Sequence, residues 1–257
     1  MKYAVEDTRM TAIANAVRAK TGKTDTMTVD EIPAEVAAVY DKGVSDTVAQ
    51  FWDMTSKGGT RKEWLYLFAH SKLKSEFFKY PITIKGTNMY CLMYLAETGD
   101  LIDLVAMERD YGFKIDFSEA TNVANAFQHA NVSRIGVVDL SKTNNAYLTF
   151  ACNMWTDKCT SIQKIITHER LDFSNAFNYR SALTHVIFEG TIGKNGLILS
   201  QSPKLDHESL LSVVNCLKDY STDTSGTTWK VTLGAANLAK LTAEEKAIAT
   251  GKGWTLE

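Results

Sequence analysis

The sequence predicts an α/β fold, in which short stacked repeats form a solenoid between a helical N-terminal hook and a small α/β C-terminal cap. The central observation is a phenylalanine that is followed by a polar turn and an alternating apolar segment. It recurs at Phe127, Phe150 and Phe177, at separations of 23 and 27 residues. Helical periodicity before residue 40 and mixed helix and strand patterns after residue 204 complete the prediction. The expected domains are residues 1–50, 51–203 and 204–257.

Residues 1–40 predict two short amphipathic helices, each with one apolar face. The apolar positions of the two faces are Met10, Ile13, Val17, Ile32, Val36 and Val39. A segment this small does not bury two such faces unaided, because chains below about 40 residues rarely hold a core. We therefore expect this helical hook to be an assembly element that binds another copy of the chain or a larger particle.

The triplet Gly22-Lys23-Thr24 within the hook resembles the end of a phosphate-binding loop. Such a loop needs a glycine four positions earlier, and Val17 stands there instead. It must also open a helix, whereas Gly22 follows a helical pattern and suits a helix end. We expect a helix stop and no nucleotide binding.

The middle of the chain predicts repeated strands that stack in parallel. Segments that begin at Ile115, Val138, Ile165 and Val186 align, and Ile115-Asp116-Phe117-Ser118 is a near copy of Val138-Asp139-Leu140-Ser141. The unit between Ile84 and Ile115 is long, and its register is ambiguous. Stacked units of this kind share one core and one sheet. An irregular α+β domain with chance similarity is the alternative.

The alternation along these strands predicts which side chains face outward. If Val138, Leu140, Val186 and Phe188 point into the core, their neighbours point to the open face of the sheet. An extended repeat face is a common binding surface, so we expect it to bind a partner; an ordinary solvated sheet is the alternative. The predicted face consists of Asp116, Asp139, Lys164, Ile166, His168, His185, Ile187 and Glu189.

The C-terminal cap predicts alternating helices and strands. Asp206 precedes an apolar helix pattern, and 229–233 and 254–256 suit strands. Thr242 and Glu245 have the spacing of a reciprocal helix cap. A repeat stack needs such an end, because its last strand otherwise exposes an unpaired edge.

Composition and charge exclude several function classes. The 257 residues are 45% hydrophobic and carry a net charge of −2, without the basic patch that nucleic acid requires. No apolar run is long enough for membrane insertion, and the start lacks the apolar run of a signal peptide, so we expect synthesis in a cytosol. We expect reduced, partly buried thiols at Cys91, Cys152, Cys159 and Cys216. A disulfide or a metal site is the alternative.

No constellation of residues predicts catalysis, a cofactor or a metal site. Asp206-His207-Glu208-Ser209 contains the residue types of a catalytic triad, but triad members meet from separate elements of a fold. Capping of a helix explains these residues better. A glycan-acting enzyme with two carboxylates across a cleft stays open as a less favoured alternative.

The repeats and both ends also resemble known families. The pattern Ala176-Phe177…Leu183-x-x-Val186-x-Phe188 resembles BspA-like leucine-rich repeats, over roughly residues 60–200. Residues 11–39 and 205–257 are similar to terminal segments of tail-associated structural proteins of phages and prophages of Gram-positive bacteria. The resemblance implies an irregular leucine-rich-repeat solenoid.

The same resemblance implies a role without catalysis. We expect a structural or receptor-contacting protein of a phage virion, in the tail, neck or baseplate, that is made in the host cytoplasm. The implied partners are other virion proteins, further copies of the chain in a trimer or ring, and a host surface protein or glycan. A bacterial surface adhesin of the same repeat class is the alternative.

Overall fold

The computed structural model describes residues 67–69, 78–79, 81, 83–96, 101–152 and 157–257. The chain divides into two units, Met1–Gly58 and Gly59–Glu257, and every described residue belongs to the second. The expected helical hook, its six apolar positions and the helix stop at Gly22 lie outside the described residues.

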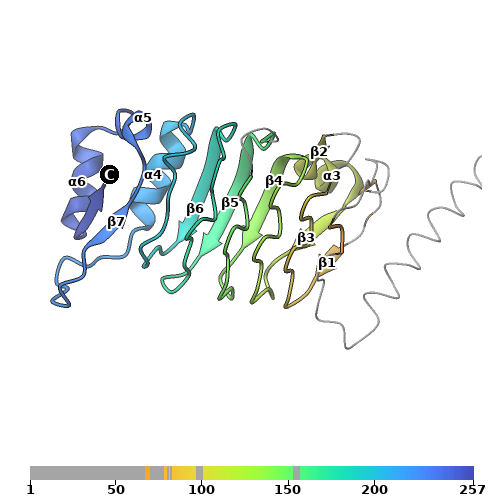
Figure 1. Cartoon of the computed structure of the whole chain (residues 1–257), viewed down its shortest axis with the longest axis horizontal. Helices are drawn as coiled ribbons and strands as arrows, with labels where there is room; N and C mark the ends of the chain where they lie inside the picture. The colour runs from red at the N-terminus through yellow and green to blue at the C-terminus, as the bar shows by residue number, and fades with distance from the viewer. Residues whose placement is uncertain (1–66, 70–77, 80, 82, 97–100, 153–156) are drawn as a thin grey trace, which may run out of the picture. The chain divides into compact units, whose positions relative to one another are not determined.

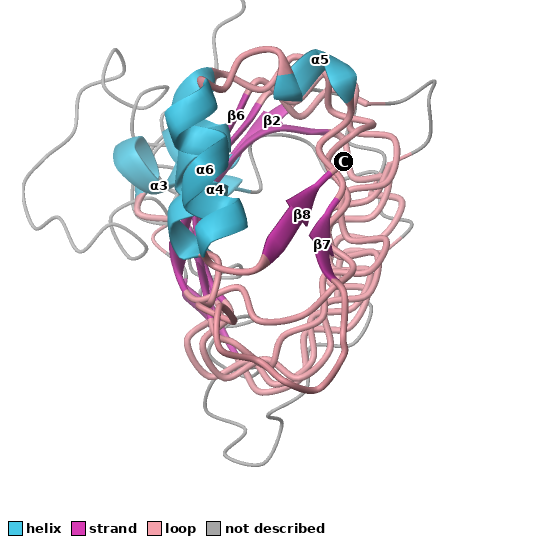
Figure 2. Ribbon diagram, turned by 90° about the vertical axis from the view of Figure 1, so that its left-hand side faces the viewer, coloured by secondary structure: helices cyan, strands magenta, loops and turns pink. Residues whose placement is uncertain are grey.

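The described part of the chain is mixed α/β with parallel sheets. A four-stranded sheet has the order β2-β4-β5-β6, and each pair of neighbours is parallel (Figure 1). Seen end-on, these strands lie on one side of the unit and connecting loops line the opposite side (Figure 2). The strands are β2 (Ile102–Asp103), β4 (Val132–Asp139), β5 (Ser161–Thr167) and β6 (His185–Gly190).

Two further parallel pairs and four helices complete the described elements. The strand pairs are β1 (Thr83–Lys85) with β3 (Lys114–Asp116), and β7 (Trp229–Val231) with β8 (Trp254–Leu256). The helices are α3 (Leu104–Tyr111), α4 (His207–Cys216), α5 (Ala235–Leu238) and α6 (Ala243–Gly251).

The loop side of the unit also repeats. Asn88, Asn122 and Asn145 form a row of parallel bridges from one turn of chain to the next. Each asparagine side chain also accepts a hydrogen bond from the backbone N–H two residues later, as short polar side chains do in turns. Three residues after each asparagine the backbone is left-handed, at Cys91, Asn125 and Leu148.

Phenylalanine rings fill the space between the two sides. The rings of Phe127 and Phe150 stack at a centroid distance of 6.1 Å, and those of Phe150 and Phe177 at 5.2 Å. All three side chains are at most 1% exposed. The predicted internal stack of these three residues is therefore confirmed. Met93 occupies the equivalent place two residues after Cys91 and is also fully buried.

A buried ion pair crosses this stack. The guanidinium of Arg180 is 2.9 Å from the Asp157 carboxylate, and both side chains are at most 2% exposed. Arg180 also donates to the backbone carbonyls of Phe150 and Phe127. The second carboxylate oxygen of Asp157 accepts from the N–H of Ala182 at 2.6 Å. These contacts tie three successive turns of chain together.

The long unit between Ile84 and Ile115 contains an inserted helix. The chain runs through β2 into α3 and then into β3, which pairs with β1. Asp103 caps α3 by accepting from the N–H of Ala106 at 3.0 Å, and Gly112 closes it with a left-handed backbone. No bridge joins β3 to β4 among the described residues, so the sheet is interrupted beside the insertion.

The predicted strand alignment is right at one pair and wrong at the next. Val138 pairs with Ile165 as expected, but Ile165 pairs with Phe188, and Val186 pairs with Ile162. The burial pattern explains the difference, because β5 places two outward residues between the buried Ile162 and Ile165. β6 places only one between its buried Val186 and Phe188. The register therefore shifts between β5 and β6.

The C-terminal elements agree with the sequence. Asp206 is the N-cap of α4, Thr242 and Glu245 form a reciprocal capping box on α6, and 254–256 is a strand. α4 follows β6 and takes the place of a further strand beside it (Figure 1). Ser209 and Ser212 of this helix accept hydrogen bonds from the backbone N–H groups of Val186 and Phe188.

Candidate functional site

The outward face of β4, β5 and β6 mixes charged and aliphatic side chains. Asp139, Ile166 and Glu189 are register partners across the three strands. Lys164 binds the Glu189 carboxylate at 2.6 Å, with both side chains more than a third exposed. Every predicted face residue is half-buried or exposed; these are Asp116, Asp139, Lys164, Ile166, His168, His185, Ile187 and Glu189.

His185 lies at the start of β6, where it is coupled to the cap of α4. Its Nδ1 is 2.7 Å from the Asp206 carboxylate. Burial works to raise the pKa of Asp206, but hydrogen bonds from Ser209 and His185 outweigh it and leave the pKa below its usual value. This contact stabilises the ionised cap at the junction of sheet and helix.

His168 follows the end of β5 and lies in a turn. Its Nε2 is 2.8 Å from the carbonyl of Thr143, and its Nδ1 accepts from the N–H of Arg170 at 3.3 Å. Both ring nitrogens are therefore engaged with backbone groups of the turns. His168 therefore links neighbouring turns of the chain through hydrogen bonds.

Asp116 does not join the sheet that holds Asp139. It lies on β3, which pairs with β1, whereas we expected successive positions in one sheet. Each aspartate accepts from the N–H two residues later, Ser118 for Asp116 and Ser141 for Asp139. Burial works to raise the pKa of Asp116, but hydrogen bonds from Ser118 and the charge of Lys85 outweigh it and lower the pKa.

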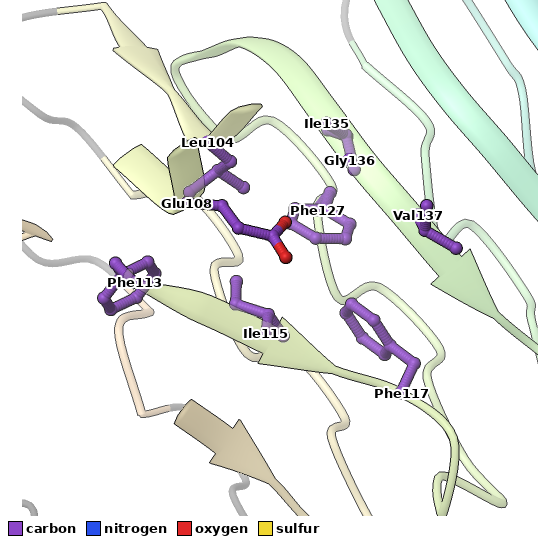
Figure 3. A pocket seen from close by; sticks show the side chains of 9 residues that line it. All are labelled: Leu104, Glu108, Phe113, Ile115, Phe117, Phe127, Ile135, Gly136 and Val137. Atoms are coloured by element: carbon purple, nitrogen blue, oxygen red, sulfur yellow. The ribbon is translucent and has the colours of Figure 1, made fainter. Parts of the chain in front are cut away.

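A pocket beside α3 was missed from the sequence. It opens where β3 and β4 part, and its empty volume, including space open to solvent, is about 300 Å³. Figure 3 shows the Glu108 carboxylate reaching from α3 over an apolar floor. The lining residues are Leu104, Glu108, Phe113, Ile115, Phe117, Phe127, Ile135, Gly136 and Val137. The unusual length of this repeat unit was the signal in the sequence that something is inserted here.

The thiols of the described residues are buried or half-buried. Burial raises the pKa of the Cys159 thiol to about 11, so it stays protonated at neutral pH. None of the four cysteines forms a disulfide. Within the ranges that the structure describes, no three histidine, cysteine or acidic side chains gather where they could hold a metal ion. None of the helices in these ranges has the length and apolar content to cross a bilayer.

No family model, no curated protein and no solved structure matches the chain.

Proposed function

We propose that the chain is a non-enzymatic structural or receptor-contacting protein of a phage virion, built on an irregular BspA-like leucine-rich-repeat solenoid. Three features support the solenoid: a parallel sheet, stacked phenylalanines and left-handed backbone that recurs at equivalent positions. Stacked units of this kind present an extended face to a partner. The terminal resemblances support the virion, and a surface adhesin of the same class is the alternative.

One observation carries the binding role: an aliphatic strip, interrupted by charged side chains, lies on the outward face of the sheet. Val137 is 49% exposed in the middle of β4. Ile166 and Ile187 are half-buried on the two following strands. Lys164 is the register partner of Val137, and Glu189 is that of Ile166, so the Lys164–Glu189 ion pair lies among these aliphatic side chains. A mixed surface of this kind is compatible with a protein interface, because non-obligate interfaces are about as apolar as the rest of a protein surface.

Substitutions on this strip test the binding role. Val137→Asp and Ile187→Asp place a charge in the strip without changing the core, so we expect unchanged thermal stability and a loss of binding to the particle or host surface. Ile248→Asp is the matched control, because Ile248 is a 39% exposed aliphatic residue on α6. Equal binding by all three variants would remove the sheet face from the proposal.

The helical hook is the proposed assembly element. Its apolar stripes are predicted from the sequence, and a segment this small would need a partner to bury them. A chain that starts at Val44 should lose the oligomeric mass of the full chain in light scattering and should fail to enter particles. If the shortened chain keeps both, the hook has no part in assembly.

A further inference from the structure

We propose that the pocket beside α3 binds one basic side chain, a lysine or arginine, of a partner chain. The pocket combines an aromatic and aliphatic floor with one carboxylate at its mouth (Figure 3). Lysine and arginine bury an aliphatic stem while their charged head stays near water. The floor suits the stem, and Glu108 suits the head.

The floor consists of side chains that belong to the core. Phe113, Phe117 and Phe127 are at most 2% exposed, although they line the pocket. The mouth is more open, since Glu108 is exposed and Val137 is 49% exposed. The volume of about 300 Å³ includes space open to solvent, and the floor side chains are themselves buried, so the enclosed part of the pocket is small. A single side chain that lies across the opening therefore suits it better than a whole cofactor.

Glu108 is available to a cation from outside. The neighbouring cations are already paired, because Arg109 binds Asp110 at 2.7 Å and Arg134 binds Asp103 through its Nε at 2.7 Å. Within the described part of the chain, the Glu108 carboxylate makes no hydrogen bond or ion pair of its own. An unpaired acid over an apolar floor is complementary to a basic side chain.

Gly136 lies at the mouth of this pocket. A Cβ there would lie 3.4 Å from Oε2 of Glu108 and 3.7 Å from Oε1 of Gln163. The backbone at Gly136 is not left-handed, so its conformation does not require glycine. Glycine within a strand weakens it and often marks a close approach by another group. Here the absent side chain leaves space beside the Glu108 carboxylate, which suits an ammonium or guanidinium head.

The test titrates the full chain with N-acetyl-lysine methylamide and with the norleucine analogue of this compound, which keeps an aliphatic stem but has no charge. Methyl NMR signals of Leu104, Ile115 and Val137 report on the pocket. We expect saturable shifts with the lysine probe, and much weaker ones with the norleucine probe. Glu108→Gln should weaken the lysine probe about threefold to fivefold, as for a partly exposed ion pair. Gly136→Val should weaken both probes, because valine suits a strand and fills the mouth.

Glu244→Gln is the charge control, because Glu244 is an exposed acid in the first turn of α6; it should bind like the unaltered chain. Absence of shifts at the pocket would overturn the proposal. Equal binding of the two probes, or unchanged binding by Glu108→Gln, would overturn it as well. The partner's identity depends on the proposed function, but the titration does not. A chain that binds the lysine probe and is absent from particles would leave the pocket standing and remove the virion role.

Discussion

The side-chain oxygen of Ser209 accepts a hydrogen bond from the backbone N–H of Val186 at 2.9 Å. Ser212, one helical turn later, does the same for Phe188 at 3.0 Å. A helix thus supplies side-chain acceptors where a further strand would supply carbonyls. These two backbone N–H groups at the β6 edge of the sheet therefore have acceptors, and α4 covers the edge, which protects it from pairing with another chain.

Removal of the Ser209 hydroxyl should destabilise the protein. In Ser209→Ala the buried N–H of Val186 loses its acceptor, and the Asp206 carboxylate loses the hydrogen bond that the Ser209 hydroxyl donates to it. We expect a loss of about 1–3 kcal/mol in the free energy of unfolding, measured by chemical denaturation. Ser141→Ala, at an exposed turn, is the control and should change it by less than about 0.5 kcal/mol. Equal effects of the two would contradict the role given to α4.

The phenylalanine stack should be equally sensitive. Phe177 is 1% exposed and contacts the rings of Phe150, Phe173 and Phe188. Phe177→Ala should cost about 3–5 kcal/mol of unfolding free energy, the usual range for a buried phenylalanine. Tyr179→Ala removes a ring that is 47% exposed and should cost far less. A loss below about 1 kcal/mol for Phe177→Ala would show that the stack is not a core.

The Arg180–Asp157 pair should show strong coupling. Arg180→Met leaves a buried carboxylate without its cation and should cost about 3–5 kcal/mol. Asp157→Asn added to it removes that charge and keeps an acceptor for the N–H of Ala182. The double variant should therefore be more stable than Arg180→Met alone in denaturant unfolding. A double variant that is less stable would mean that the pair contributes through packing only.

The cap of α4 should make stability depend on pH. The folded-state pKa of Asp206 is lowered, so its ionised form contributes stability above about pH 4, and this is lost as pH falls through the lowered pKa. Asparagine also caps helices well, so Asp206→Asn should lose only about 1 kcal/mol or less at pH 7, because the carboxylate is 45% exposed. The unfolding free energies of the unaltered chain and of Asp206→Asn, measured between about pH 7 and pH 2, should converge at low pH. If the difference between them stays constant over this range, the ionised carboxylate is not its cause.

The sequence was most informative where local chemistry decides the structure. The stack of Phe127, Phe150 and Phe177 followed from spacing, and the caps at Asp206 and Thr242 followed from short motifs. The caps depend on residues that are near one another in sequence, and the stack depends on a repeat that spacing makes visible. The turn chemistry of Asn88, Asn122 and Asn145 is also local and was readable, but it was overlooked.

The features that were missed depend on the backbone in three dimensions. One extra outward residue in β5 shifts the register with β6, and alternation alone does not reveal where a strand takes two. The pocket depends on an inserted helix and on a side chain that is missing at Gly136. Asp116 and Asp139 lie in near-identical sequence motifs, yet the interruption of the sheet beside α3 places them in different sheets.

The proposed role in a phage virion is tested most directly by locating the chain in cells that produce it. Particles from a lysed or induced culture are separated from cell envelopes on a density gradient, and the chain is quantified in both fractions by immunoblot. The virion role predicts that the chain sediments with the particles at a constant ratio to the capsid protein and resists a salt wash. A chain that stays with the envelopes and is absent from particles would contradict the virion role and favour the surface adhesin.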